Sequence, residues 1–196
     1  KSAMKRALKV LTRFSGMARE EGVHKTVATA TSAVRDAKNG PQFIRDVYKK
    51  TEIRIKIISG SEEGRLIFLG ASSASELPKG KLLIIDIGGG SAEFVLGVSR
   101  RIDYDESFPL GVARLKDRFL KKDPPSKENF RNLEEYVDEK LDEIVDKIGH
   151  KKFTLIVGTG GTMINLASMI YEKKESRRLR LRGYFEIRRK EVRKLH

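Results

Sequence analysis

The 196-residue sequence contains no cysteine and no tryptophan. Without cysteine, disulfide bonds and thiolate metal sites are excluded, and a reducing compartment is favoured, so we expect a cytoplasmic protein. No apolar run approaches the roughly 18 residues that a membrane-spanning helix needs, and no charged-then-apolar signal segment opens the chain. The composition therefore predicts no membrane partner.

Acidic residues are also comparatively scarce. The chain has 41 basic and 27 acidic residues, which gives a formal net charge of +14. Such a surface attracts polyanions, among them nucleic acid, anionic lipid and phosphate polymers. A solvated basic surface explains any single cluster of lysine and arginine. For the excess over the whole chain, a polyanionic ligand is the favoured interpretation.

The most informative stretch is an apolar run that ends in three glycines and is flanked by two carboxylates, residues 82–94. The run predicts a buried strand that delivers Asp86 to a glycine turn, and the next strand carries Glu93. Consecutive glycines let backbone N–H groups approach an anion closely, as phosphate-binding loops require. The alternative is a tight hairpin turn with a structural aspartate. The phosphate-binding candidates in this turn are Gly88, Gly89, Gly90 and Ser91.

Helical and strand periodicities alternate along the chain, which predicts an α/β fold. Ser126 is the expected cap of a long helix, and residues 72–80 and 177–182 read as connections. Helices are expected at 2–20, from 41, from 61, at 112–120, 126–148 and 163–170, and near 187–195. Strands are expected at 24–31, 53–58, 81–87, 91–98, 101–108 and 153–157.

The second half of the chain has the element order of a ribonuclease-H-like domain, three strands followed by helices, a strand and a helix. The first half shows only helix, strand, helix, strand, helix, without three opening strands. We expect two domains, at residues 1–75 and 76–196.

Five segments, in one order and at one set of spacings, resemble the exopolyphosphatase and guanosine pentaphosphate phosphohydrolase (Ppx/GppA) family. The resemblance covers roughly residues 1–190. Five motifs in register are far more specific than any one of them. The segments are 28–40, 58–70, 86–93, 109–115 and 158–162.

This resemblance implies two ribonuclease-H-like domains of the actin, sugar-kinase and chaperone-ATPase superfamily around a cleft. Compared with the family pattern, the first domain lacks its opening strands with their Asp-x-Gly-Ser-Asn phosphate loop. The second domain lacks the family's closing strand and helices. Ala92 replaces a more usual threonine, and Gly64 a frequent alanine. We expect a part of a catalytic core that is inactive alone.

The implied activity is Mg²⁺-dependent hydrolysis of the terminal phosphoanhydride bonds of inorganic polyphosphate. The resemblance matches Glu63 to the carboxylate that activates the water, although from its own surroundings it reads as an exposed glutamate at a helix start. Arg35 is expected to bind a phosphate, with pairing to Asp36 as the alternative. Thr31 and Ser32 either donate hydroxyls to the same phosphate or cap a helix, and both remain open.

Asp86 and Glu93 are the expected metal ligands, because hard carboxylate oxygens suit Mg²⁺. The turn 158–162 resembles the element that holds adenosine in the superfamily's kinases, and a plain strand-to-helix turn is equally compatible. Its phosphate-binding candidates are Gly160 and Gly161.

Three other functions stay open: guanosine pentaphosphate hydrolysis, non-catalytic binding of polyphosphate or an alarmone nucleotide, and nucleic-acid binding, which the ordered motifs disfavour. A homodimer also stays open, because incomplete domains often expose apolar faces.

Overall fold

The computed structural model describes residues 2–73, 79–175 and 184–195. Two compact units divide the chain, Lys1–Glu63 and Gly64–His196. The division falls inside α4 (Gly60–Ser72), a continuous helix. The domain boundary expected between residues 75 and 76 lies outside the described residues, so the expected domain limits stay a prediction.

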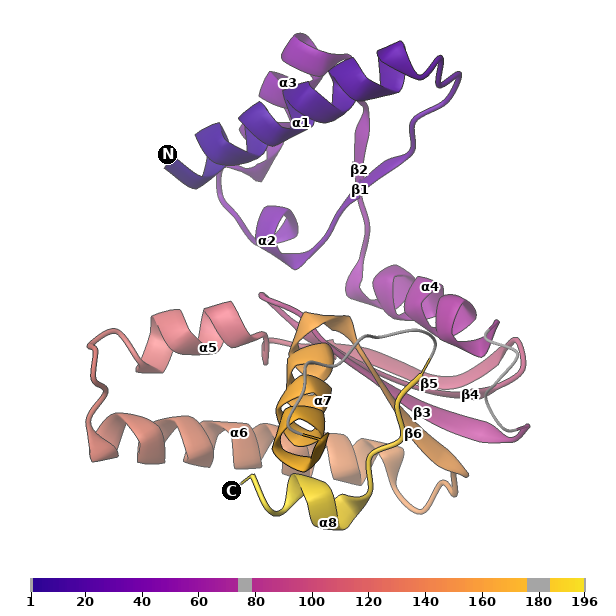
Figure 1. Cartoon of the computed structure of the whole chain (residues 1–196), viewed down its shortest axis with the longest axis vertical. Coiled ribbons are helices and arrows are strands. Elements are labelled where there is room, and N and C mark those ends of the chain that lie inside the picture. The colour runs from indigo at the N-terminus through magenta and orange to yellow at the C-terminus, as the bar shows by residue number, and fades with distance from the viewer. Residues whose placement is uncertain (1, 74–78, 176–183, 196) are drawn as a thin grey trace. The chain divides into compact units, whose positions relative to one another are not determined.

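The first unit is built around a short parallel strand pair (Figure 1). Ala28 pairs with Ile55 and Ala30 with Ile57, and the crossover between the two strands contains α3, against which α1 packs. Val47 of α3 is fully buried. The elements are α1 (Ser2–Glu20), β1 (Ala28–Ala30), α2 (Ser32–Arg35), α3 (Gly40–Thr51) and β2 (Ile55–Ile57).

The second unit is a four-stranded sheet in the order β5-β4-β3-β6. The strands β3, β4 and β5 are antiparallel neighbours, whereas β6 runs parallel to β3 after a long helical connection, as parallel pairing requires. The elements are β3 (Lys81–Ile87), β4 (Ala92–Val98), β5 (Arg101–Phe108), α5 (Val112–Phe119), α6 (Lys127–Ile148), β6 (Leu155–Thr159), α7 (Gly160–Glu175) and α8 (Arg189–Val192).

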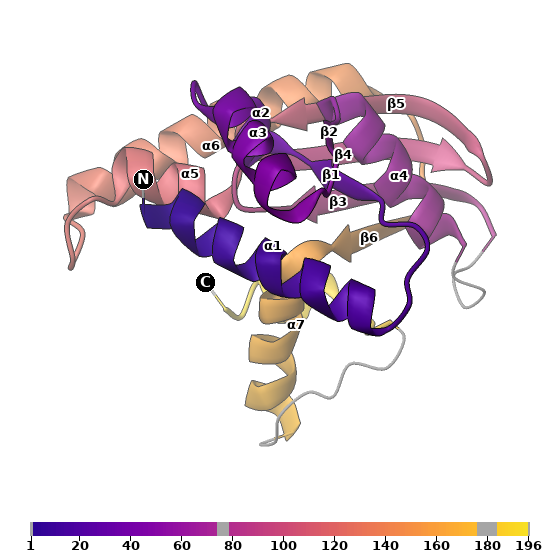
Figure 2. The same cartoon turned by 90° about the horizontal axis from the view of Figure 1, so that it is seen from above.

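Helices cover both faces of this sheet, which explains why the central strands are apolar without strict alternation (Figures 1 and 2). On one face, Phe68 of α4 packs against Leu82, Ile84 and Val95. On the other face, a second cluster receives side chains from α6. Its buried members are Leu83, Ala92, Phe94, Leu96, Phe108, Leu110, Ile144 and Ile148.

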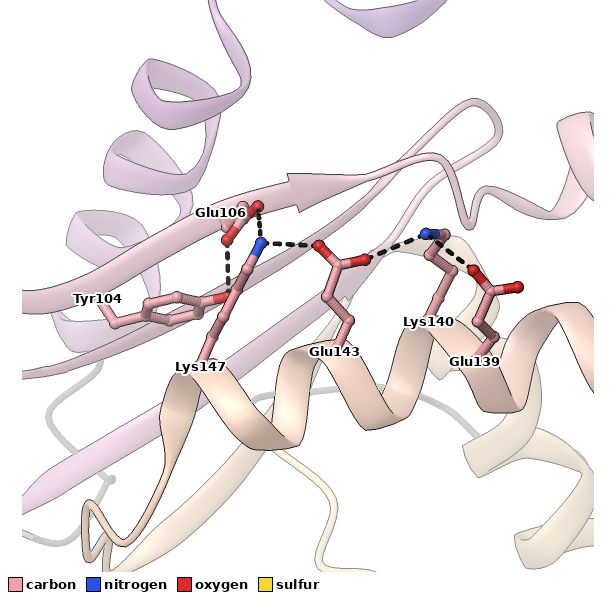
Figure 3. A network of polar contacts seen from close by, with 6 residues as sticks. All are labelled: Tyr104, Glu106, Glu139, Lys140, Glu143 and Lys147. Carbon is pink, nitrogen blue, oxygen red and sulfur yellow. Dashed lines mark hydrogen bonds and ion pairs between the residues drawn. The ribbon is translucent and has the colours of Figure 1, made fainter.

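A polar network joins α6 to β5 at the margin of that second cluster (Figure 3). Lys147 Nζ donates to Glu106 Oε1 at 2.6 Å and to Glu143 Oε1 at 2.7 Å, and Tyr104 Oη donates to Glu106 Oε2 at 3.1 Å. These bonds raise the pKa of Lys147 and lower that of Glu143. Burial, followed by the charge of Glu106, raises the pKa of Tyr104.

The element order confirms the α/β prediction, and the sheet is that of a ribonuclease-H-like domain. Ser126 caps α6 through a reciprocal pair of hydrogen bonds with Asn129, as expected. The single turn α2 begins at Ser32, where one of the two open interpretations of Thr31 and Ser32 requires a helix. One local prediction was wrong: no separate turn spans 158–162, because β6 runs to Thr159 and α7 begins at Gly160.

The expected connection at 177–182 lies outside the described residues, as does part of the connection at 72–80. The final helix is confirmed only as the single turn α8. Among the described residues, none of the helices has the length and apolarity needed to cross a bilayer.

Candidate functional site

Strand register brings four polar side chains into one row across the second unit's sheet. Glu93 of β4 lies opposite Ser107 of β5 on one side and opposite Asp86 of β3 on the other. Asp86 in turn pairs with Thr159 of β6. The row crosses all four strands beside the turn between β3 and β4, where the parallel strands β3 and β6 both approach their carboxyl ends. In open α/β sheets this edge is the usual place for ligands.

Each carboxylate in the row accepts a hydrogen bond from the hydroxyl beside it. Ser107 Oγ donates to Glu93 Oε1 at 2.8 Å, and Thr159 Oγ1 donates to Asp86 Oδ2 at 2.5 Å. Glu93 is only 2% exposed. A carboxylate so deeply buried is costly unless it is well partnered, and two carboxylates directly opposite each other repel. The row is therefore a place where a cation would be stabilising.

A β-bulge decides which residue of β5 stands next to Glu93. Close to the β4–β5 turn, Gly97 pairs with Ile102, but the next pair is Leu96 with Tyr104, so Asp103 is an extra residue on β5. Lys81 donates to the Asp103 carboxylate at 2.5 Å, and this bond lowers the Asp103 pKa.

If β5 lacked the extra residue, the regular antiparallel register that starts at Gly97 and Ile102 would pair Glu93 with Glu106. The bulge instead places Ser107 there and turns Glu106 to the other face, because a shift of one residue exchanges the faces of a strand.

The glycine loop beside the row is held by its carbonyl groups. The amides of Val112 and Ala113, in the first turn of α5, donate to the carbonyls of Gly88 and Gly89 at 3.0 and 2.9 Å. The Gly88 amide closes the turn on the Ser91 carbonyl at 3.0 Å. No described residue accepts a hydrogen bond from the Gly89 or Gly90 amide, so the loop can present these two N–H groups to an anion.

Two residues that the sequence interpretation did not single out fix this loop in place. Gly111 packs so closely that an added Cβ would lie 2.4 Å from backbone atoms of Gly89 and Gly90. Arg114 Nε donates to the Gly90 carbonyl at 2.6 Å. The segment 109–115 thus braces the glycine loop, a role that its matched motif did not by itself reveal.

The two glycines at the start of α7 are not equivalent. Gly160 has a φ of +81°, and an added Cβ would lie 2.9 Å from Asp86 Oδ1, so glycine is required there by both backbone and space. Gly161 has nothing within 4 Å of that position. Gly160 therefore brings the chain against the Asp86 carboxylate, whereas Gly161 lies in open space at the helix N-terminus.

In the first unit, Arg35 and Glu63 form an ion pair, with 3.2 Å between Arg35 Nη1 and Glu63 Oε2. The same Nη1 donates to the Ile58 carbonyl at 2.9 Å. Both side chains are partly buried, at 23% and 16% exposure. Asp36 is also near, 3.7 Å from Arg35 Nε. The structure thus joins two predicted site residues that lie 28 positions apart in the sequence.

Thr31 and Ser32 lie at the start of α2, beside this ion pair in sequence. Thr31 is the N-cap residue, but its side chain makes no capping bond, and its backbone carbonyl accepts from Val34 and Arg35. Ser32 is buried, and its hydroxyl donates to Asp36 Oδ2 at 3.2 Å. Side-chain capping by Thr31 is therefore not observed, and phosphate binding by either residue stays a prediction.

The oxygen donors of the second unit fit a hard cation. Asp86 and Glu93 provide two neighbouring carboxylates, and Ser107 and Thr159 orient them. Within the described ranges no group of three or more His, Cys, Asp or Glu could hold a metal ion, which argues against a site built entirely from protein ligands. Mg²⁺ commonly uses one or two carboxylates together with waters and substrate phosphates, so the residues present suit it.

Comparison with known proteins gives consistent matches. The sequence model of the Ppx/GppA phosphatase family matches residues 1–196 of this chain. Exopolyphosphatase 1 of Mycobacterium leprae is 33% identical over 170 residues, which are 86% of this chain and 50% of that protein. The chain therefore spans about half the length of this curated relative.

Solved structures show the same likeness in three dimensions. A crystal structure of an exopolyphosphatase from Cytophaga hutchinsonii has a TM-score of 0.80 and 34% identity, covering 89% of this chain and 57% of that one. The Aquifex aeolicus member of the Ppx/GppA family has a TM-score of 0.67 and 29% identity, covering 89% of this chain and 55% of that one.

Proposed function

Because the chain belongs to the Ppx/GppA phosphatase family, we propose that the whole protein hydrolyses terminal phosphoanhydride bonds of inorganic polyphosphate. The observation that carries this proposal is the row Ser107–Glu93–Asp86–Thr159 beside a glycine loop whose carbonyls are all turned to α5. Such hydrolysis needs neutralisation of phosphoryl charge, an in-line water, and a group that orients or deprotonates this water.

In this proposal the glycine loop binds the phosphoryl oxygens. The amides of Gly89 and Gly90 donate to them, and the bonds from α5 and from Arg114 keep the loop from rearranging when the anion binds. Ser91 is buried, so it contributes through the shape of the turn and, once substrate is bound, through its hydroxyl. Donors fixed in advance cost little reorganisation at the moment of reaction.

Asp86 and Glu93 are the residues that would hold Mg²⁺. The ion would neutralise charge shared with the phosphate oxygens. The protein's own contribution is to aim both carboxylates, and here the hydroxyls of Ser107 and Thr159 each hold one oxygen. This arrangement leaves the other oxygen of Asp86 for the ion.

Glu63 is the proposed general base. Its ion pair with Arg35 holds the carboxylate in one orientation, as a positioned base requires. Arginine carries five N–H donors, and only Nη1 is used by the bonds to Glu63 and Ile58. Arg35 can therefore orient the base and still contact a phosphate, with Thr31 next to it.

Guanosine pentaphosphate is the second candidate substrate, since its terminal phosphate is joined by the same kind of bond. The observation that favours it is the start of α7, where Gly161 leaves open space next to the contact between Gly160 and Asp86. The N–H groups at a helix N-terminus bind anions, so this end of α7 suits a phosphate of the nucleotide.

The test is phosphate release from long-chain polyphosphate with Mg²⁺, by the whole protein and its Glu63→Gln variant. We expect the rate to fall by about 10²–10⁴-fold, the usual contribution of a general base. Glu62→Gln is the matched control, because this neighbour lies in the same first turn of α4 and should retain nearly full activity.

Equal losses in the two variants would contradict the assignment of Glu63. Binding of polyphosphate without release would instead identify a non-catalytic relative. Faster release from guanosine pentaphosphate than from polyphosphate would make the nucleotide the principal substrate.

A further inference from the structure

A groove on the first unit is lined by residues that have no role in the assignments above. It has a volume of about 410 Å³ and is lined by Ile44, Arg45, Tyr48, Lys49, Arg54 and Ile55. Four of these residues come from α3, Arg54 directly precedes β2, and Ile55 is the first residue of β2. The groove is shallow and open to solvent, so a ligand would lie along it with one side exposed.

Three cations converge on this groove without a carboxylate partner. Among the described residues, no acidic side chain lies within ion-pair distance of Arg45, Lys49 or Arg54. Arg45 Nη2 donates instead to the neutral Gln42 Oε1 at 2.9 Å. Like charges four residues apart on a helix, such as Arg45 and Lys49, repel each other. The groove therefore gains stability from an anion.

Some cations elsewhere in the described part of the chain do have carboxylate partners. Lys81 is paired with Asp103 at 2.5 Å, and Lys147 bridges Glu106 and Glu143 (Figure 3). Other exposed cations, such as Lys5 and Lys9 of α1, form no ion pair with a described residue either. What distinguishes the groove is that its cations border an apolar and aromatic surface.

The remaining lining is apolar and aromatic. Ile44 and Ile55 are half-buried, and Tyr48 is 44% exposed. Arg54 lies over the Tyr48 ring, with its Cζ 5.4 Å from the ring centroid, which fixes the guanidinium as a flat surface at the groove. A purely inorganic anion would leave this apolar surface unused.

We propose that the groove binds a nucleotide, with the base against Tyr48, Arg54 and the two isoleucines, and the phosphates on Arg45 and Lys49. Aromatic and guanidinium faces stack on any base, and a nearby cation pair satisfies the phosphates. None of its lining residues is among the proposed hydrolytic residues, so its occupant would act as an effector.

The test uses methyl NMR of the full chain in EDTA, so that binding is observed without hydrolysis. The δ1-methyl signals of Ile44 and Ile55 are assigned with the variants Ile44→Val and Ile55→Val and followed during titration with ATP. We expect saturable shifts of both signals. Inorganic tripolyphosphate should require about tenfold higher concentration, because it lacks the stacking contribution of the base.

The variant Lys49→Ala/Arg54→Ala should weaken ATP binding about tenfold or more, as expected for the loss of two charge-assisted contacts. Lys5→Ala/Lys9→Ala removes the same charge from exposed positions of α1 and should leave the affinity within about twofold.

Three results would overturn the proposal: shifts that do not reach Ile44 and Ile55, equal affinity for tripolyphosphate and ATP, or an equal loss in both double variants. Equal affinity for tripolyphosphate and ATP would identify a polyanion site. An equal loss in both double variants would identify non-specific charge attraction. Because no turnover is measured, failure here leaves the proposed hydrolysis untouched, and failure of the Glu63 test leaves this site untouched.

Discussion

At the scale of single residues, the candidate site depends on hydroxyl groups as much as on carboxylates. Ser107 and Thr159 have no charge, yet each holds one oxygen of a carboxylate next to the glycine loop. An acidic side chain that rotates freely loses affinity for a metal, and partners of metal ligands typically contribute 10–100-fold. These two residues are positioning residues for Glu93 and Asp86.

Thr159→Val tests this role, because valine keeps the shape of threonine and removes the hydroxyl. We expect the Mg²⁺ concentration for half-maximal phosphate release to rise by about tenfold, with a stability loss of only about 1 kcal/mol. Thr159→Ser retains the donor and should behave like the wild type. The measurement is a Mg²⁺ titration of activity together with urea unfolding, and an unchanged Mg²⁺ requirement in Thr159→Val would remove Thr159 from the site.

At the scale of elements, α5 and the glycine loop form one structure. The carbonyls of the loop accept hydrogen bonds from the amides in the first turn of α5. Gly111 packs directly against the backbone of the loop. Precision in the loop therefore comes from a helix that follows it by some 20 residues, since Arg114 contacts Gly90 at a separation of 24.

Gly111→Ala should disrupt the packing between α5 and the glycine loop, because its Cβ would overlap backbone atoms of Gly89 and Gly90. We expect a loss of roughly 1–3 kcal/mol, as for overpacked cores, and a larger proportional loss of polyphosphate hydrolysis. Gly70→Ala in α4 is the control. It has nothing within 4 Å and should stabilise the protein by about 0.5–1 kcal/mol. Urea unfolding of both variants gives the comparison, and a neutral Gly111→Ala would contradict the tight packing.

The α6–β5 network predicts a pH dependence of stability whose sign follows from the pKa shifts. The Glu143 pKa is lowered from its ordinary value of 4.5, so its stabilisation is present above that value and is lost as the pH falls. The Lys147 pKa is raised from 10.5, so its stabilisation is present below that value and is lost at higher pH.

Lys147→Met keeps much of the aliphatic length of the side chain and removes the charge shared by Glu106 and Glu143 (Figure 3). We expect its melting temperature to lie below that of the wild type at about pH 7 and to approach it at about pH 3. Lys152→Met, at an exposed position just after α6, should show no such convergence. A constant difference across pH would mean that packing, and not charge, explains the loss.

At the scale of the whole molecule, the net charge of +14 shapes encounters with any polyanion. Long polyphosphate contacts many cations weakly, and salt screens exposed charges beyond about 10 Å at roughly 0.1 M ionic strength. The charge should therefore affect capture of substrate more than its chemistry.

Raising NaCl from about 50 to about 300 mM should increase the KM for long-chain polyphosphate several-fold more than the KM for tripolyphosphate. The kcat for both substrates should change little, since the proposed reacting groups lie in partly buried positions. Steady-state kinetics on the whole protein at the two salt concentrations would show this. Parallel increases for the two substrates would assign the salt effect to the site itself.

Local sequence determined most of the elements of this protein, because periodicity and helix caps depend on residues a few positions apart. The strands 81–87 and 101–108 and the cap at Ser126 follow from such neighbours, and so does the position of the glycine loop. The excess of basic residues and the absence of cysteine are also properties of composition alone.

Only the tertiary structure decided which side chains meet. Arg35 reaches Glu63 because β1 and β2 pair in parallel, and Thr159 reaches Asp86 across 73 residues because β6 adds to β3. The extra residue Asp103 decides that Ser107, and not Glu106, stands beside Glu93. Register is set by long-range pairing and by such bulges, and a shift of one residue reverses the face of every side chain, so short-range pattern cannot specify it.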